Sequence, residues 1–412
     1  MGANVQKEVQ QGECPSQPKD VSAIFGTGPD CPDVNTVKEQ TKDNEQINVE
    51  PENKLAVSEG RDQHELLEKD GRQGTPRYDA PKVYSKGEEL ILGLPNRNST
   101  SCYITSLIQV LAQTPGLMEC LLSYKQKSCI AETLINLFCV VNDVQDPHEN
   151  VADVLCSLLR DIQNKMAARD DSYSEGIQND SHCLLLCLLN ALDDEERDGL
   201  YIFDGQMRNS FTYSNCSHVE ESALEPFKSL PMSVNNKLST VEDSIMHMIS
   251  VDTFYDSDIP CRKCIKEGRH SQDTVTEKRL IIVVAPEILV LQLSRFHQVW
   301  ASGDKLCTKM EKYDGHVQYS STLSLPVIQK DEDDHTGCAV TYELYGVICH
   351  EGTMENGHYW CYVKQNGWDK AHPYLWHLCS DSYVRRLEIN EEWPDSPYAY
   401  LLFYKQCMKE KG

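Results

Sequence analysis

The order of two hydrophobic patterns constrains the fold of this chain most strongly. Between residues 102 and 192, apolar side chains recur at helical spacing, as Ile104, Leu107, Ile108 and Leu111 do. From residue 280 to 404, the apolar segments are rich in Val, Ile, Tyr and Trp, which strands favour. Helices followed by strands, without regular alternation, predict an α+β fold and argue against a parallel α/β sheet.

The same patterns predict the individual elements. We expect a helix that begins at Cys102 and three further helices at 134–141, 151–162 and 183–192. We expect strands at 280–284, 288–293, 342–349, 358–363 and 398–404. A helical lobe that faces a sheet lobe leaves a cleft between them.

The first eighty residues have a different composition. They are rich in Gln, Asp, Glu, Lys, Pro and Gly, and Phe25 is the only aromatic residue before Tyr78. Such a segment cannot bury enough apolar surface to offset the entropy lost on ordering. We therefore expect a disordered acidic tail at 1–85 and one large domain at 86–407.

Charge and hydropathy argue against nucleic-acid binding and against a membrane span. The formal net charge is -25, from 39 Lys and Arg against 64 Asp and Glu, and this charge repels a nucleic-acid backbone. The longest apolar runs, 280–284 and 288–293, are separated by Pro286 and fall far short of the roughly 20 residues of a membrane span. We expect neither nucleic-acid binding nor a membrane span.

Cysteine usage and the start of the chain indicate a reducing compartment. The first residues lack both the apolar core of a secretory signal and the Ser or Thr of a myristoylation site. Many of the 18 cysteines lie in apolar contexts such as 137–140 and 186–188, where Cys behaves as a small hydrophobic residue. We expect the protein in the cytoplasm, the nucleus or both.

Cys102 is the first candidate for chemistry. It follows a polar segment rich in Gly, Asn and Ser, residues 93–101, and opens the first predicted helix. A helix N-terminus presents positive potential and free N–H groups, which lower a thiol pKa from about 8.5 and can hold an oxyanion. The alternative is an ordinary helix N-terminus with an incidental cysteine.

A predicted β-hairpin near the other end of the chain carries a histidine, His358. Strand alternation puts His358 and Trp360 on one face and Tyr359 on the other, and Gly357 lets a substrate backbone pass closely. A histidine there can take the thiol proton and return it to a leaving amine. A structural histidine is the alternative, and His350 at the end of the preceding strand is a second candidate.

A third segment, residues 376–384, supplies a group that can orient the imidazole. A polar triplet follows an aromatic strand there, and either Ser380 or Asp381 can accept a hydrogen bond from the imidazole N–H. A solvated turn is the alternative.

Together these segments resemble the ubiquitin-specific protease family over nearly everything from Glu89 to Tyr404. Five stretches match the family's motifs in the family's order, which is far more specific than any one match. They are the Cys box (Cys102-Tyr103, Ser106-Leu107, Gln109, Leu111), a Gln-Gln-Asp-Ala-His-like start (Gln178 to His182), a Phe-x-Gly step (Phe203 to Gly205), a Leu-Lys-Arg-Phe-like strand (Leu291 to Phe296) and the His box (Tyr345 to Tyr362).

The resemblance implies a fold and an activity. The implied fold is a papain-like thumb and palm with β-sheet fingers, here roughly residues 205–280, that grip ubiquitin. The implied activity is thiol-dependent hydrolysis of the bond after the C-terminal Gly of ubiquitin or a ubiquitin-like protein, with Cys102 as nucleophile and His358 as general base. Such catalysis requires no cofactor at the active site. We expect ubiquitin, or a ubiquitin-like protein, and its conjugates as partners of a monomer.

Two active-site positions depart from the family pattern. The family places an oxyanion Asn five residues before the Cys, where this chain has Arg97, with Asn96 one residue further away and Asn98 one nearer. Asn96 is the candidate donor, and Asn98 or a backbone N–H is the alternative. Loss of one such donor lowers a rate by roughly a hundredfold to a thousandfold. At the third catalytic position, Ser380 stands where the family usually has Asp or Asn, with Asp381 next.

Further departures concern ubiquitin contacts and zinc. Asn179 replaces the second Gln of the Gln-Gln-Asp-like segment, and Cys183 stands where an acidic residue is expected. Many family members hold zinc in the fingers with two Cys-x-x-Cys pairs, but this chain keeps three candidate ligands, Cys216, Cys261 and Cys264.

The fourth zinc position leaves two interpretations. Tyr213 occupies the position of the missing Cys, and His218 lies two residues after Cys216. A site of three Cys and one His is chemically reasonable. A decayed site packed by side chains is the interpretation that Tyr213 favours.

Two other functions compete with an active deubiquitinase. One is a ubiquitin-binding pseudoprotease that keeps the fold without turnover, which the shifted Asn, Ser380 and Tyr213 would favour. The other is a protease for another ubiquitin-like modifier, which the same residues would serve. The presence of both Cys102 and His358 in matching contexts favours the enzyme.

Overall fold

The computed structural model describes residues 91–407, apart from short gaps at 125–127, 143–149, 196–199, 256–259, 270–274, 301–307, 329–336, 354–355, 370–371 and 388–392. The tail predicted for 1–85 and the predicted domain start at 86 lie outside the described residues. Backbone contacts divide the chain into two units, Met1–Thr75 and Pro76–Gly412, and every described residue belongs to the second. This unit has a helical layer, an eight-stranded sheet and a five-stranded sheet.

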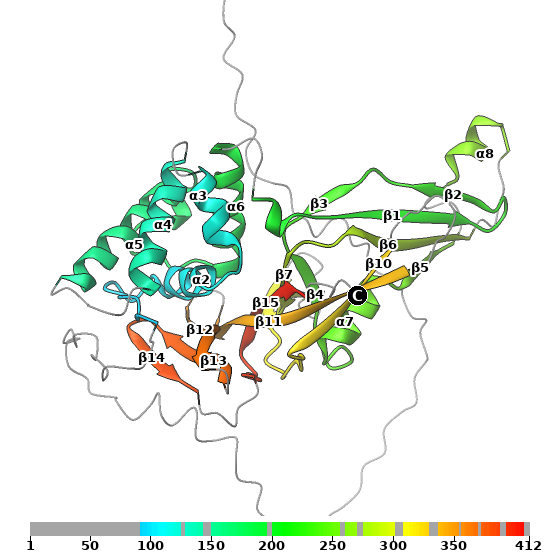
Figure 1. Ribbon diagram of the computed structural model, residues 1–412. Coiled ribbons are helices and arrows are strands. Elements are labelled where there is room, and N and C mark those ends of the chain that lie inside the picture. Colours follow the sequence, from blue (N-terminus) through cyan, green and yellow to red (C-terminus); the bar gives the residue numbers. More distant parts are fainter. Residues whose placement is uncertain are drawn as a thin grey trace, which may run out of the picture. The chain divides into compact units, whose positions relative to one another are not determined.

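The helical layer contains five helices, drawn in cyan to green in Figure 1. They are α2 (Cys102–Ala112), α3 (Leu117–Tyr124), α4 (Cys129–Asn142), α5 (Val151–Ala167) and α6 (Ser181–Glu195), with 3-10 turns at Asp171–Tyr173 and Tyr201–Phe203. Helix α2 is buried along nearly its whole length, which fits its apolar composition. Helix α5 instead buries one stripe at three- and four-residue spacing, formed by Leu155, Leu159, Ile162 and Met166.

The eight-stranded sheet carries the C-terminal half of the unit. In order across the sheet, its strands are β14 (Tyr383–Arg386), β13 (His372–Ser380), β12 (Gly357–Asp369), β11 (Gly337–Gly352), β15 (Ala399–Gln406), β7 (Ile288–Ser294) and β4 (Leu230–Ser233), and β10 (Thr322–Ile328) pairs with β11. Strands β11, β12 and β13 form two successive antiparallel hairpins. The predicted hairpin that carries His358 is therefore confirmed.

The five-stranded sheet forms the predicted fingers. Its strands are β2 (His218–Glu221), β1 (Gly205–Tyr213), β6 (Thr276–Val284) and β5 (Val251–Phe254) in order, and β3 (Glu225–Phe227) pairs with β1. The short helix α8 (Arg262–Lys266) lies at the far end of this sheet (Figure 1). Within the same sequence range, β4 joins the eight-stranded sheet and α7 (Val241–Met248) packs against β4.

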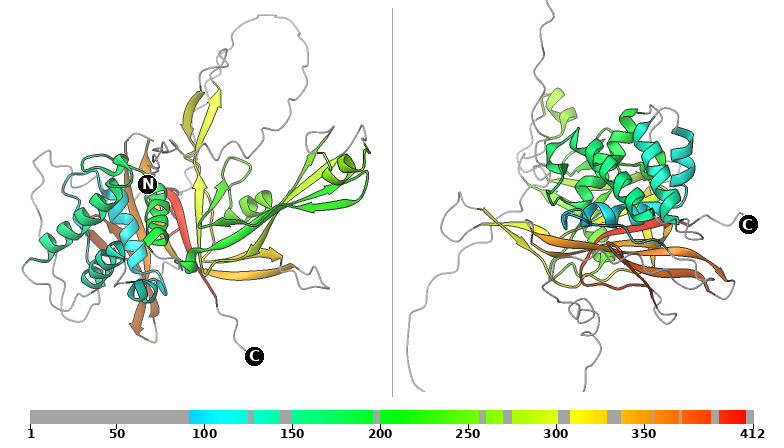
Figure 2. Two further views of the ribbon diagram at one scale, coloured as in Figure 1. Left: turned by 90° about the horizontal axis from the view of Figure 1, so that it is seen from above. Right: turned by 90° about the vertical axis from the view of Figure 1, so that its left-hand side faces the viewer.

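The core has two parts, one on each face of the eight-stranded sheet. The helices cover one face, and α2 lies directly against β12 (Figure 2). Alternation along β12 divides its side chains, since Tyr359, Cys361 and Val363 join the helical cluster. Trp360 and Tyr362 join the second cluster, on the other face.

Arg295 joins the sheet to a separate two-stranded ribbon, β8 (Phe296–Trp300) and β9 (Thr308–Lys312). Its guanidinium group is buried and donates to the backbone carbonyls of Ala399, Pro397, Tyr313 and Gly315. Five guanidinium N–H donors allow one side chain to satisfy several carbonyls at once. The arginine of the Leu-Lys-Arg-Phe-like segment therefore fixes the base of the ribbon.

The elements predicted from periodicity are confirmed. The four expected helices lie within α2, α4, α5 and α6, and four of the expected strands lie within β6, β7, β11 and β12. The fifth, expected at 398–404, begins one residue before β15. The α+β assignment is confirmed as well. In the part of the chain that the structure describes, no helix combines the length and apolar character needed to cross a membrane.

Candidate active site

Cys102 is the first residue of α2, the helix at the centre of the helical layer. Cys102 is only 2% exposed because α2 packs against β12, and the backbone N–H of Tyr359 is close enough to lower the pKa of its thiol. Tyr359 directly follows His358 in β12. The first predicted segment and the predicted hairpin therefore meet at the thiol.

His358 lies near the start of β12 and contacts the strand beside it. Its Nε2 lies 2.8 Å from Ser380 Oγ, at the end of β13. The imidazole stacks on Trp360, with ring centroids 6.1 Å apart and an interplanar angle of 20°. With Nε2 engaged by the serine, Nδ1 is the ring nitrogen that remains for the thiol.

Ser380 and Asp381 have different partners. The Ser380 hydroxyl contacts His358, whereas the Asp381 carboxylate accepts hydrogen bonds from Thr105 Oγ1 at 2.8 Å and Asn96 Nδ2 at 3.1 Å. Asp381 has a positive φ of 50° in the turn between β13 and β14, and this turn separates the two side chains. The structure therefore brings Ser380 to the imidazole and Asp381 to the loop before Cys102.

The loop at 91–100 is attached to that turn by the backbone as well. Leu94 N–H donates to Asp381 C=O at 2.9 Å. At Gly93, a Cβ atom would lie 2.3 Å from the carbonyl oxygen of Ser382, so only glycine fits at this approach. These contacts fix the start of the segment that leads into α2.

The two candidate oxyanion residues lie in different surroundings. Asn96 Oδ1 accepts from the Ser101 N–H at 3.1 Å and its hydroxyl at 2.8 Å, which places the amide beside the N-terminus of α2. Asn98 is exposed and donates to Glu175 Oε1 at 2.7 Å. Of the two, Asn96 is the one that the structure connects to Asp381, and its amide group carries a second N–H donor.

The pKa of Cys102 is shifted in the opposite direction to the one predicted. Burial raises the pKa of the Cys102 thiol above its ordinary value, the Tyr359 backbone N–H lowers it, and the Asp381 charge raises it again. The prediction that the helix N-terminus lowers the pKa of Cys102 is therefore wrong. The loss of water around the buried thiol raises the pKa more than the N–H groups lower it. A base is needed to generate the thiolate.

The second histidine candidate, His350, lies on the neighbouring strand. It is 4% exposed, and burial, aided by the charge of Lys312, lowers its pKa to about 4. Its ring lies 4.5 Å from that of Tyr359, and a Cβ on Gly357 would lie 2.1 Å from its Nε2. The same Cβ would lie 2.6 Å from the Glu351 carbonyl oxygen, so the backbone of β11 and the His350 ring together require glycine before His358.

Gln178 and Asp180 connect the helical layer to the hairpin. These contacts were not indicated by the sequence. Gln178 Oε1 accepts from Gly357 N–H at 3.3 Å, and its Nε2 donates to the Ser99 carbonyl at 3.4 Å. Asp180 accepts from the hydroxyls of Tyr359 at 3.0 Å and Tyr400 at 2.7 Å. The only sign of their importance in the sequence was their position in the Gln-Gln-Asp-like motif. The motif supports both the cysteine loop and the histidine strand.

A comparison with family models decides the kind of protein. The model described as ubiquitin carboxyl-terminal hydrolase matches residues 92–404. This chain belongs to that family. The ubiquitin-specific proteases that the motifs resemble belong to this family. The predicted family is therefore confirmed.

Two curated relatives indicate how far the likeness extends. Ubiquitin carboxyl-terminal hydrolase 17-like protein E of Mus musculus is 26% identical over 335 residues, which cover 76% of this chain and 55% of that protein. Probable ubiquitin carboxyl-terminal hydrolase 8 of Schizosaccharomyces pombe is 23% identical over 327 residues, which cover 76% and 64%. The chain therefore spans between half and two thirds of the length of these relatives.

Solved structures confirm the fold. The SAGA Ubp8/Sgf11/Sus1/Sgf73 DUB module bound to ubiquitin aldehyde contains a chain that superposes with a TM-score of 0.63 at 19% identity, covering 77% of this chain and 70% of that one. At this identity the likeness shows the fold alone. The papain-like thumb, palm and fingers expected from the motifs describe the fold of this chain.

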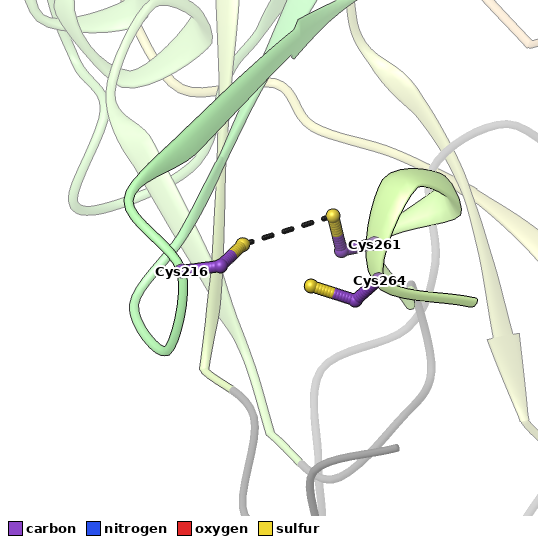
Figure 3. A group of neighbouring side chains, drawn as sticks. All are labelled: Cys216, Cys261 and Cys264. Atoms are coloured by element: carbon purple, nitrogen blue, oxygen red, sulfur yellow. Dashed lines mark hydrogen bonds between the residues drawn. The ribbon is translucent and has the colours of Figure 1, made fainter. Parts of the chain in front are cut away.

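The three candidate zinc ligands come together at the end of the fingers. The sulfur atoms of Cys216, Cys261 and Cys264 all lie within 4.8 Å of one another (Figure 3). Three convergent thiols have the softness and spacing that Zn²⁺ requires, so these residues fit a structural zinc ion. Zinc binding at this place stays a prediction.

Proposed function

We propose that this chain is a thiol-dependent deubiquitinase that hydrolyses the isopeptide or peptide bond after the C-terminal Gly of ubiquitin. Family membership supports this function, because the match covers the segments that carry Cys102, His358 and Ser380. The observation that carries the proposal is the contact of 2.8 Å between His358 Nε2 and Ser380 Oγ, on the strand β12 that packs against the helix of the buried Cys102 thiol. Together these groups are a nucleophile, a base and an orienting acceptor.

Thiol activation is the first step of the proposed mechanism. With Nε2–H donated to Ser380, the His358 Nδ1 lone pair accepts the Cys102 proton. Because burial and Asp381 raise the thiol pKa, this transfer is essential for reactivity near neutral pH. The resulting thiolate attacks the carbonyl carbon of the terminal glycine and forms a tetrahedral oxyanion.

Asn96 and the backbone stabilise that oxyanion in the proposal. One amide N–H of Asn96 is engaged by Asp381, which leaves the second to donate to the oxyanion together with the Cys102 backbone N–H. The imidazolium then protonates the leaving amine, and the C–N bond breaks. Water, deprotonated by His358, hydrolyses the thioester and releases the ubiquitin carboxylate.

Ser380 makes this site differ from one with a carboxylate in the third position. A hydroxyl accepts from the imidazole but brings no negative charge, so it stabilises the imidazolium less than Asp would. Asp381, one residue further on, bonds to Asn96 and Thr105. We infer that the orienting and charged roles are divided between two adjacent residues.

Ubiquitin is the substrate that the comparisons favour. The superposed Ubp8 module has been solved with ubiquitin aldehyde and with monoubiquitin, and we infer the same partner for this chain. We further propose that the chain acts as a monomer in the cytoplasm, the nucleus or both. The cysteines of the described residues are free thiols, which a reducing compartment preserves.

The first test uses full-length protein, Cys102→Ala and the matched variant Cys120→Ala, which alters another buried cysteine of the helical layer. Each is incubated with ubiquitin that carries a C-terminal thiol-reactive electrophile, and separately with ubiquitin joined to a fluorescent amine. We expect one covalent adduct and amine release, both lost in Cys102→Ala and both retained in Cys120→Ala.

Other outcomes would contradict the proposal in different ways. An adduct without amine release would indicate a ubiquitin-binding protein with impaired turnover. No adduct with ubiquitin, but one with an electrophile on a ubiquitin-like protein, would change the substrate. Adduct formation that persists in Cys102→Ala would assign the nucleophile to another cysteine.

A further inference from the structure

The end of the hairpin that carries His358 extends beyond the neighbouring strands. Within the described residues, β15 pairs with β11 only as far as Cys349, and β13 pairs with β12 only from Cys361 onward. The last rungs of the hairpin therefore have no described strand on either side. They are His350↔Tyr359, Glu351↔His358 and Gly352↔Gly357. An uncovered strand end opens more easily than the centre of a sheet, so the position of the imidazole depends on other contacts.

Lys312 takes the place of a strand beside the end of β11. Its Nζ donates to the His350 carbonyl at 3.2 Å and to the Gly352 carbonyl at 3.0 Å. These carbonyls lie on the edge of β11 from which the His350 N–H donates to the Tyr398 carbonyl at 2.9 Å. Two charge-assisted hydrogen bonds from one ammonium group thus hold the uncovered end of β11.

The ammonium group is itself held at the base of the β8–β9 ribbon. Lys312 is the cross-strand partner of Phe296, and its Nζ lies 5.9 Å from the centroid of the Phe296 ring. That ring also lies 6.0 Å from the His350 ring. The next residue, Tyr313, donates its N–H to the Arg295 carbonyl at 2.6 Å and accepts from the Arg295 guanidinium at 3.0 Å. This end of the ribbon is therefore a firm support for β11.

The charges around Lys312 leave backbone carbonyls as its main partners. Only 12% of its side chain is exposed, and the Asp314 carboxylate, which is 80% exposed, lies 3.7 Å from Nζ. Burial lowers the pKa of Lys312, Asp314 raises it, the charge of Arg295 lowers it further and Glu351 raises it. A largely buried ammonium needs polar groups in place of the lost water, and the two β11 carbonyls supply them.

The uncovered end of the hairpin is also the part that reaches the thiol. His358 stands opposite Glu351, which lies between the two residues whose carbonyls bind Lys312. On its own strand, His358 is followed by Tyr359, whose N–H lowers the pKa of the Cys102 thiol. A displacement of β11 at this rung would therefore move the imidazole relative to the thiol.

We propose that Lys312 is a positioning residue for His358. Its two hydrogen bonds fix the uncovered end of the hairpin to the ribbon and so keep the imidazole within reach of the Cys102 thiol. This role rests on the function proposed above, since it takes Cys102 and His358 as the reacting pair. Reaction of the thiol with a small alkylating agent tests the role without ubiquitin.

The pH dependence of Cys102 alkylation by iodoacetamide measures how well the base reaches the thiol. Full-length chains are treated over a range of pH, and mass spectrometry of their peptides assigns the label to Cys102. In Lys312→Met, the curve should move to higher pH and alkylation near neutral pH should slow about tenfold, because a displaced imidazole no longer accepts the proton of a thiol whose pKa burial raises. Lys312→Arg keeps the charge and the N–H donors and should stay within about threefold of the native rate.

Turnover separates positioning from substrate binding. With ubiquitin joined to a fluorescent amine, Lys312→Met should lower kcat about tenfold and change KM less than about threefold. The affinity for ubiquitin, measured in the Cys102→Ala chain, should stay unchanged when Lys312→Met is added.

Lys364→Met is the matched control. The Lys364 side chain is 14% exposed, and its ammonium group is bound to Glu343 of β11, in a part of the hairpin that β13 and β15 both cover. Its loss should lower thermal stability and leave the alkylation curve in place. Where Lys312→Met does not fold, Lys312→Gln keeps N–H donors with a shorter reach and should shift the curve less, in the same direction.

Three results would overturn the proposal. An alkylation curve that stays in place in folded Lys312→Met or Lys312→Gln would refute the positioning role. An equal shift in Lys364→Met would attribute the effect to lost stability. A loss of ubiquitin affinity without a shifted curve would assign Lys312 to substrate binding. If the native chain releases no amine from ubiquitin, the proposed function fails, whereas the alkylation curves still decide the role of Lys312.

Discussion

The active site and the end of the fingers have each lost a residue that the family pattern predicts, and the candidate substitute is held in place differently in each. At the active site, Arg97 occupies the expected asparagine position, and Asn96 bonds to Asp381, which is 285 positions away in the chain. In the fingers, Tyr213 occupies a cysteine position, and the candidate fourth ligand, His218, is its cross-strand neighbour within one hairpin. One compensation depends on tertiary contacts, and the other depends on the register of two adjacent strands.

The two regions should therefore respond differently to a substitution: its effect spreads over several groups at the active site and stays local in the fingers. A change at Asp381 acts on the oxyanion loop, Thr105 and the thiol pKa together, since all three contact or feel its carboxylate. A change at His218 or Tyr213 stays within one hairpin and α8. We therefore expect strong coupling between residues at the active site and nearly independent effects between the two regions.

The largest effect is expected from the Asn96–Asp381 pair. Asn96→Ala and Asp381→Ala should each lower kcat roughly a hundredfold to a thousandfold, because the oxyanion loses a donor or that donor loses its support. The double variant should be about as slow as either single variant, because both changes remove the same function. Amine release from a ubiquitin–fluorophore conjugate measures all three rates.

A matched control is available on the same loop. Asn98→Ala removes the hydrogen bond to Glu175 and should change kcat less than about threefold. If the Asn96 and Asp381 effects multiplied in the double variant, the two residues would act separately. The contrast with the fingers would then fail.

Ser380→Ala is expected to have a smaller effect. Loss of the acceptor for His358 Nε2 should lower kcat about fivefold, since one neutral hydrogen bond contributes roughly 1 kcal/mol. KM should stay unchanged because the serine does not hold the substrate. Ser382→Ala, an exposed neighbour, is the control. Equal rates for the native chain and Ser380→Ala would mean that Trp360 stacking alone orients the imidazole.

Much of the fold was predictable because its central elements have strong periodicity. Helix α2 and strands β7, β11 and β15 are long and largely buried, so apolar residues mark them in the sequence. The finger strand β1 is half-exposed along most of its length and shows no alternation. Strands β3 and β4 each contain a proline, Pro226 and Pro231, which weakens a strand pattern.

The active site was predictable only in part. Motif context located Cys102 and His358, but the choice between Ser380 and Asp381 depended on a positive φ at Asp381 that the sequence does not encode directly. The choice between Asn96 and Asn98 depended on contacts across 285 positions. The roles of Thr105 and Gln178 also rest on long-range contacts, which span 276 and 179 positions. By contrast, the pairing of Tyr213 with His218 follows from a short hairpin.

Asp381→Asn isolates the electrostatic part of this network. The aspartate charge raises the pKa of the Cys102 thiol, so its neutralisation should lower that pKa. The pH dependence of alkylation by iodoacetamide should therefore move to lower pH, because the thiolate is the reactive form. Glu175→Gln, which neutralises the carboxylate bound to Asn98, should leave the curve in place. A shift to higher pH would show that the carboxylate stabilises an imidazolium–thiolate pair instead.

The smallest effect is expected from Tyr213→Phe, which tests why a tyrosine occupies a family cysteine position. Its hydroxyl reaches Glu220 only at 3.4 Å, so its loss should lower the free energy of unfolding by less than about 1 kcal/mol. The ring that stacks on His218 is kept, and zinc affinity should change less than about twofold.

Tyr213→Ala removes the ring and should weaken zinc binding several-fold. If the tyrosine merely filled a decayed site, Tyr213→Ala would lower stability equally with and without zinc. A loss of stability that is larger in zinc than in chelator would instead identify the aromatic ring as the support of the fourth ligand.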